Sequence, residues 1–109
     1  MKAKYCKLVV FVPRTHLEKV RKVVCEAGAG KIGTKYDCCT FVTEGIGAFR
    51  PLKGAGPFIG RAGKLAKVKE ARLETIVAKK VLKKVIAAMI AAHPYEEPAF
   101  DIIPLLSLP

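Results

Sequence analysis

The amino-acid sequence predicts an α+β fold in which two helices cover one face of an antiparallel sheet. Three observations lead to this prediction. Four segments carry the hydrophobic patterns of strands, two carry the periodicity of amphipathic helices, and a glycine-rich stretch separates the two halves of the chain. A chain of 109 residues fits one domain, which we expect to span residues 1–109.

The first half of the chain begins with a strand and a helix. Residues 4–12 include a run of five apolar residues, which is typical of a central strand covered on both faces. After Pro13, Thr15 and Glu18 have the spacing of a capping box, in which Thr15 is the N-cap of a helix. We expect Gly28 to end this helix in a left-handed conformation. The apolar residues at helical spacing are Leu17, Val20, Val23, Val24 and Ala27.

Three more strands and a second helix are expected. Residues 36–43 and 70–77 alternate between the two faces of a sheet, as half-buried strands do. Residues 100–105 form the final strand. Residues 79–92 have the periodicity of a helix with Leu82, Val85, Ile86, Met89 and Ile90 as its buried stripe. The inward residues of the third strand are Ala71, Leu73, Thr75 and Val77.

These elements follow the order β-α-β, a long connection, then β-α-β, which is the ferredoxin-like split pattern. The connection, residues 43–64, contains six glycines, two prolines and several apolar residues that can anchor it. We therefore expect an ordered excursion with room for a short extra hairpin. With both helices on one face, the other face of the sheet is left bare. The hydrophobic content of 51% indicates that a partner subunit covers it.

The four cysteines are expected to be small buried hydrophobic residues. Cys6, Cys25, Cys38 and Cys39 include no C-x-x-C pair, so neither a zinc site nor thioredoxin-like chemistry is indicated. The alternative to buried hydrophobic residues is a redox or thiol-nucleophile role. Cys38 and Cys39 should point to opposite faces of a strand. No apolar run approaches the roughly 20 residues of a membrane span. Since the first residues also lack the pattern of a signal peptide, we expect a cytoplasmic protein with no membrane partner.

The net charge of +11 raises the question of nucleic-acid binding. The basic residues are dispersed along the chain, without an arginine-rich tail or interleaved aromatic residues. Their densest cluster lies on the outer face of the second helix, where a solvated surface is the simpler interpretation. These residues are Lys79, Lys80, Lys83 and Lys84. Nucleic-acid binding therefore ranks below the binding of a small ligand or a metal ion.

Residues 93–101 place an imidazole, a phenol and three carboxylates on backbone stiffened by two prolines. His93, Glu96 and Glu97 are candidate ligands for a divalent metal, the one cofactor that the sequence suggests. If the chain is extended, Glu96 and Glu97 point to opposite sides, so only one joins His93 easily. The alternative is that His93 caps the carbonyls at the helix C-terminus.

The glycine-rich connection is the candidate ligand-binding region. Arg50 lies between Phe49 and Pro51, which restrict it, and can hold an anion. The hypothesis is a cleft in which His93, with Glu96 or Glu97, forms one wall and the loop of the same or a neighbouring subunit forms the other. Its ligand would be small and either anionic or cationic. The alternative is that these charges only solubilise the loop. The further candidate ligand-binding residues are Gly45, Gly47, Lys53 and Tyr95.

Several motifs together resemble one known family. They are Phe11-Val12-Pro13, His16-Leu17-Glu18, Ala27-Gly28-Ala29-Gly30, Ile32-Gly33, Tyr36-Asp37-x-Cys39, Gly45-x-Gly47-x-Phe49-Arg50-Pro51-Leu52, Pro57-x-Ile59-Gly60 and His93-Pro94-Tyr95-Glu96-Glu97-Pro98-Ala99. Nearly the whole chain is similar to the PII-like insert domain of YqfO-type proteins, in the NGG-interacting-factor-three-like group. One departure is Thr34-Lys35, where the family usually has a single residue.

The resemblance implies a fold like those of PII signalling proteins and CutA-type proteins, which are usually trimeric. They bind small ligands or cations near loops and subunit clefts. In the larger family members the module lies between two halves of a metal-binding domain. Those halves are absent from this sequence, so the resemblance assigns no metal site or hydrolase activity of that domain to any residue of this chain.

We therefore expect a non-enzymatic module that binds a small ligand or regulates a partner, assembled as a homotrimer. A divalent-metal-binding protein of CutA type is the alternative. With two histidines in the chain, no Ser-His-Asp or Cys-His-Asn set can be assembled, so no catalytic residue is assigned.

Overall fold

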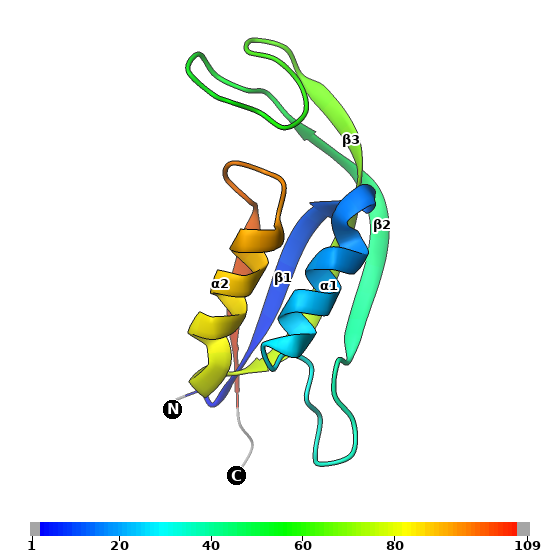
Figure 1. Ribbon diagram of the computed structural model, residues 1–109, viewed down its shortest axis with the longest axis vertical. Helices are drawn as coiled ribbons and strands as arrows, with labels where there is room; N and C mark the ends of the chain where they lie inside the picture. The colour runs from blue at the N-terminus through cyan, green and yellow to red at the C-terminus, as the bar shows by residue number, and fades with distance from the viewer. Residues whose placement is uncertain (1–2, 107–109) are drawn as a thin grey trace.

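The computed structural model describes residues 3–106 (Figure 1). A short 3₁₀ turn precedes each helix, Arg14–His16 before the first and Lys79–Val81 before the second. The strands and α-helices of this range are β1 (Tyr5–Pro13), α1 (Leu17–Glu26), β2 (Thr40–Phe49), β3 (Ala66–Ala78), α2 (Leu82–Ala92) and β4 (Phe100–Leu105).

Within the described residues, the four strands form one antiparallel sheet in the order β2-β3-β1-β4. The central strand β1 pairs along its whole length with β3, from Tyr5↔Ala78 to Pro13↔Glu70. On its other side, β1 pairs with β4. Helices α1 and α2 lie side by side on one face of the sheet (Figure 1). The predicted ferredoxin-like fold is confirmed.

The hydrophobic core lies between this face of the sheet and the helices. Alternate residues of β1 and β3 point into it, because side chains of a strand alternate between its faces. All four inward residues predicted for β3 are buried, and the hydroxyl of Thr75 among them donates a hydrogen bond to the carbonyl of Cys39 (2.9 Å). The largest fully buried side chains include Leu8, Val10, Val12, Val20, Val24, Leu73, Val85 and Met89.

Strand β2 differs most from its prediction. It begins at Thr40 rather than at residue 36 and continues to Phe49, while β3 already begins at Ala66. The two strands pair from Thr40↔Thr75 to Phe49↔Ala66, so they form a long hairpin and the glycine-rich loop shrinks to residues 50–65. Gly45 and Gly47 thus lie within a strand. The sequence predicted a loop there because glycine weakens a strand interior.

The predicted capping box at the start of α1 is wrong. His16, at the end of the 3₁₀ turn, is the N-cap residue, and no side chain caps the helix. The hydroxyl of Thr15 instead lies 2.8 Å from Nδ1 of His16. Glu18 forms an ion pair with Arg21, at 2.6 Å. Both side chains of the expected box therefore have other partners.

The end of α1 follows the prediction. Gly28 has a φ of +115°, in the region that favours glycine. Its N–H bonds to the carbonyl of Cys25 and the N–H of Ala29 to that of Val24, which is the Schellman arrangement. The N–H of Gly30 then bonds to the carbonyl of Ile76 at 2.7 Å, which attaches the following loop to β3.

A disulfide joins Cys25 to Cys38, so the prediction of free, buried thiols is wrong for this pair. Cys38 has a φ of +56°, which is incompatible with a strand and explains why β2 begins only at Thr40. Cys38 and Cys39 are therefore not neighbours on a strand, as predicted. Cys6 and Cys39 are free, and Cys6 is buried.

Helix α2 confirms most of its predicted stripe. Val85 and Met89 are fully buried, and Leu82 and Ile86 pack against the core. Ile90 is instead 47% exposed. It lies about 100° around the helix from Met89, at the edge of the stripe. No helix of residues 3–106 is long and apolar enough to cross a membrane.

The sheet face opposite the helices is mixed rather than purely apolar. Phe41 of β2 is 68% exposed there, and Ile103 of β4 is also exposed. Charged residues of neighbouring strands lie between them, including Arg72 and Glu74. Val9 at the centre is nonetheless buried. This face has apolar groups that a partner would cover and charges that would set the partner's orientation.

We predict that thiol labelling will detect the disulfide. Denatured but unreduced protein should take up two equivalents of a thiol reagent, on Cys6 and Cys39, and reduced protein four. The Cys25→Ser variant should take up three without reduction, because Cys38 then loses its partner. Mass spectrometry gives both numbers. Uptake of four equivalents by unreduced wild-type protein would contradict the assignment.

Candidate functional site

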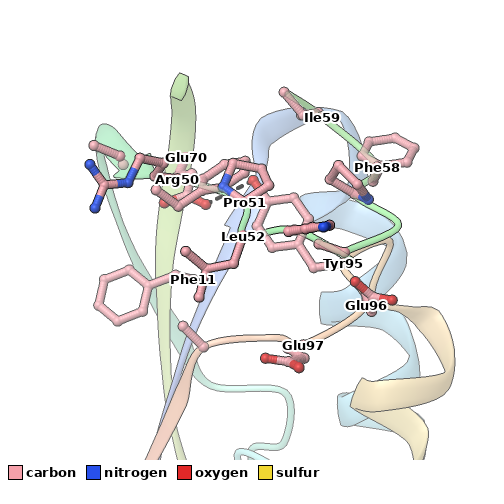
Figure 2. Close-up of a pocket in the computed structure, with 18 residues that line it drawn as sticks. Phe11, Arg50, Pro51, Leu52, Phe58, Ile59, Glu70, Tyr95, Glu96 and Glu97 are labelled. Carbon is pink, nitrogen blue, oxygen red and sulfur yellow. Dashed lines mark hydrogen bonds between the residues drawn. The ribbon is translucent and has the colours of Figure 1, made fainter. Parts of the chain in front are cut away.

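A cleft of about 640 Å³ opens between the glycine-rich loop and the segment that connects α2 to β4 (Figure 2). The end of β2 (residues 47–49) and loop residues 50–55 and 57–59 form one wall, and Tyr95, Glu96 and Glu97 belong to the opposite wall. Phe11 of β1 and Glu70 of β3 complete the lining. The cleft thus brings together most of the predicted site residues, namely Gly47, Arg50, Lys53, Tyr95, Glu96 and Glu97.

Two predicted site residues do not line this cleft. Gly45 lies in an adjacent, smaller depression beside Thr43 and Arg72. His93 is buried, with 7% of its surface exposed, behind Tyr95. The expectation that His93 forms a wall of the cleft is therefore wrong, and the residues that follow it form the wall instead.

His93 is held by backbone groups on both sides of its ring. Nδ1 accepts a hydrogen bond from the N–H of Tyr95 (3.1 Å), so the proton of the neutral ring is on Nε2. Nε2 donates it to the carbonyl of Phe11 (2.7 Å). Burial lowers the pKa of His93, because desolvation disfavours the imidazolium, although the carbonyl of Phe11 opposes this shift. His93 thus fastens the end of α2 to the central strand.

These contacts leave His93 without a free nitrogen for a metal. In residues 3–106, no three side chains of His, Cys, Asp or Glu lie close enough together to hold a metal ion. Glu96 and Glu97 both line the cleft and are the carboxylates that a cation could reach there.

Tyr95 connects the two walls through Glu70. Its hydroxyl donates a hydrogen bond to Oε2 of Glu70 (2.9 Å), and its ring packs against Phe49 and His93, with centroids 5.8 and 4.9 Å away. Burial and the nearby carboxylate both raise the pKa of Tyr95, so its hydroxyl stays protonated and remains a donor. Tyr95 is half-buried by these contacts.

Gly47 gives the carboxylate of Glu70 its space. A Cβ at position 47 would overlap Oε1 of Glu70, whereas a Cβ at Gly45 would meet no atom within 4 Å. A glycine on an edge strand therefore allows an acidic side chain of the next strand to lie across it and reach Tyr95. The predicted inward residues of β3 left Glu70 on the outer face of the strand, and no role was predicted for its carboxylate. A glycine at position 47 is the sequence signal that could have indicated this contact, but it was assigned to the loop.

Glu96 fixes the loop. Its Oε1 accepts a hydrogen bond from the N–H of Gly56 (3.1 Å), 40 residues away in the chain. Phe58 also contacts the body of the domain, edge-on to the ring of His16 with centroids 5.3 Å apart. Pro51 is buried, whereas its neighbour Arg50 is exposed. The glycine-rich loop is thus ordered by a few specific contacts.

No protein-family model matches the chain. It is similar to one segment of longer bacterial proteins named GTP cyclohydrolase 1 type 2 homolog. It is 54% identical over 99 residues to that of Halalkalibacterium halodurans, covering 91% of this chain and 26% of the relative. It is also 54% identical over 103 residues to the protein of that name from Bacillus subtilis, covering 94% of this chain and 27% of the relative. The chain therefore spans about a quarter of the length of these relatives.

Several solved structures have the same fold as this chain. A Bacillus cereus protein related to NIF3 aligns with a TM-score of 0.81 and 49% identity, over 96% of this chain and 27% of that one. CutA from Archaeoglobus fulgidus aligns with a TM-score of 0.66 and 16% identity, over 93% of this chain and 83% of that one. CutA1 from Shewanella sp. SIB1 aligns with a TM-score of 0.70 and 13% identity, over 98% of this chain and 86% of that one. The fold is CutA-like and PII-like. This PII-like domain matches the CutA proteins over most of their length and the NIF3-related protein over one segment only.

We predict that Gly47→Ala destabilises the domain by about 1 kcal/mol, because the added methyl group turns the flexible carboxylate of Glu70 aside and breaks its hydrogen bond to Tyr95. Gly45→Ala is the matched control. It lies in the same strand with open space around it, so its free energy of unfolding should stay equal or rise by up to about 1 kcal/mol. Urea denaturation measures both values. Equal losses for the two variants would contradict the role of Gly47.

The stability of the domain should fall at acidic pH, because protonation of His93 opposes its burial. The unfolded histidine has a pKa of about 6.5 and the folded one a lower pKa, so the unfolded state binds more protons between the two values. Stability is then complete above about pH 6.5 and declines by up to about 1.4 kcal/mol per pH unit below it. Urea titrations between about pH 7.5 and 5.5 measure this slope. His93→Gln should flatten this slope, because it removes the buried imidazole that takes up the proton on unfolding.

Proposed function

We propose that the domain is a non-enzymatic module that binds a small ligand in the cleft and acts as a homo-oligomer. The observation that carries this proposal is the composition of the cleft. Arg50, Lys53 and Glu97 line the cleft beside aromatic and aliphatic side chains. They form no ion pair within residues 3–106. A concave, largely apolar site with a few polar groups is the usual form of a small-molecule site. The ligand would contact a loop that is held by few bonds, so binding could change the position of this loop. Such a change is how the module would regulate a partner.

The proposed assembly is a homotrimer in which the uncovered sheet faces meet. Exposed Phe41 and Ile103 on that face support it, since large apolar side chains on a sheet face are usually covered by a partner. The resemblance to PII-like proteins also favours this number of subunits. Arg72 and Glu74, which lie between the apolar residues, would then select one relative orientation of the subunits.

A divalent cation is the alternative ligand. Glu96 and Glu97 supply oxygen atoms in the cleft, and proteins named for divalent cation tolerance share the fold. His93 could join them only by giving up its bond to the N–H of Tyr95. A cation held there would therefore depend mainly on carboxylates, which suits hard cations better than a histidine-containing set would.

Native mass spectrometry of freshly purified protein tests the assembly and the ligand together. We expect a trimer that retains a small organic molecule. Arg50→Gln should reduce that retention about tenfold or more, because a charged contact is lost. Arg61→Gln, in the same loop but outside the cleft lining, should leave it unchanged. Retained metal lost in Glu97→Gln would favour the alternative, and a bare monomer would contradict both.

A further inference from the structure

Residues 31–38 form a loop that leaves the body of the domain after α1 and returns just before β2. Backbone hydrogen bonds close the base of this loop. The N–H of Gly30 bonds to the carbonyl of Ile76 in β3 (2.7 Å), and the N–H of Cys39 bonds to the carbonyl of Gly30 (3.0 Å). None of these bonds involves a sulfur atom, so both ends of the loop should stay on the sheet when the disulfide is open.

The disulfide ties this loop to α1. Cys25 lies in the last turn of the helix, and Cys38 is the last residue of the loop. Among the described residues, no hydrogen bond or ion pair joins residues 31–38 to the helix. Their one bond of this kind to a neighbouring segment is from the thiol of Cys39 to the carbonyl of Asp37, at 3.7 Å. Opening the disulfide would therefore release the loop and leave the sheet and helices in place.

The two cysteines of the bond are accessible, and one has an unfavourable backbone conformation. Cys25 and Cys38 are half-buried, and residues 31–37 are all exposed. Cys38 has a φ of +56°, in the left-handed region that side chains other than glycine rarely adopt. Opening the bond removes the restraint that keeps it there. Disulfides that are exposed or strained are reduced more easily than buried structural ones.

From these observations we propose that the Cys25–Cys38 disulfide is a reversible redox site, opened by a thiol or dithiol reductant. A thiolate of a dithiol attacks one sulfur of the bond, and the second thiol of the dithiol resolves the mixed disulfide. The products are two cysteine thiols and the oxidised dithiol, so two electrons and two protons pass to the protein. The bond then decides whether Ile32 and Tyr36, both exposed, belong to a fixed or to a mobile surface.

This redox site is separate from the proposed ligand site. The loop lies at the end of the molecule remote from the glycine-rich loop, where it is drawn in cyan (Figure 1). The inference therefore does not depend on the proposed function, and either can fail without the other.

Equilibration of the native protein in mixtures of reduced and oxidised glutathione tests whether the bond is reversible. The fraction of open bond, counted by thiol labelling and mass spectrometry, should rise from nearly none to nearly all as reduced glutathione replaces the oxidised form. It should fall again when oxidised glutathione is restored. Cys39→Ser keeps both partners of the bond and is the control, which should follow the same curve. A bond that stays closed in every mixture until the protein is denatured would overturn the inference.

Amide exchange measured by NMR tests what the bond holds. The N–H of Ile32 bonds to the carbonyl of Tyr36 inside the loop (3.1 Å). Its exchange should become about tenfold faster or more on reduction, because the released loop opens more often. The amide of Gly30, at the base, should keep its rate within about twofold. Cys38→Ser should show the reduced pattern with or without a reductant.

Two exchange results would contradict the inference. An unchanged rate for Ile32 on reduction would show that other contacts fix the loop. Loss of protection throughout β1 and β3 would show that the bond stabilises the whole fold, as a structural disulfide does. If Cys38→Ser does not fold, Cys25→Ser carries the same test, and failure of both variants to fold would also identify the bond as structural.

Discussion

The imidazole of His93 joins the segment that follows α2 to the central strand, and the position of the cleft depends on it. Its two nitrogens bond to the carbonyl of Phe11 on the central strand and to the N–H of Tyr95 after α2. The segment leaving the helix is therefore fixed against the sheet before it reaches the cleft. Tyr95, Glu96 and Glu97 take their directions from this anchor. Any ligand site built from them rests on a neutral, buried ring and not on a metal-binding histidine.

Local patterns in the sequence predicted the fold well. Alternation along β3, periodicity along α2 and the glycine after α1 each indicated the right element, because burial on one face repeats with the period of the backbone. The errors occur where a long-range contact overrides local preference. Cys38 is held outside the strand by its bond to Cys25, and the glycines of β2 stay in the strand because β3 pairs with them. Neither partner can be read from neighbouring residues.

The sequence predicted most residues of the candidate site but not how they are arranged. Arg50 and the residues from 93 to 97 stood out in the sequence, since stiff, polar segments are rare without a purpose. The inward direction of His93 was not predictable, because a histidine at a helix end is compatible with either direction. Glu70 was missed because its outward position on β3 is ordinary, and only the structure shows Gly47 of the next strand beneath its carboxylate. Such contacts depend on the register of two strands, and register is set by the whole hairpin.

The pairing of β1 with β4 has a consequence for how the domain can be used in evolution. Tyr5, at the start of β1, is the register partner of Leu105, at the end of β4, so the chain enters and leaves the sheet at neighbouring points. Both points lie at the end of the molecule remote from the glycine-rich loop (Figure 1). A fold with adjacent entry and exit can be spliced into a surface turn of another protein without stretching either partner. Its cleft would remain exposed at the far end, so the same binding surface can serve as an independent protein or as an appendage of a larger one.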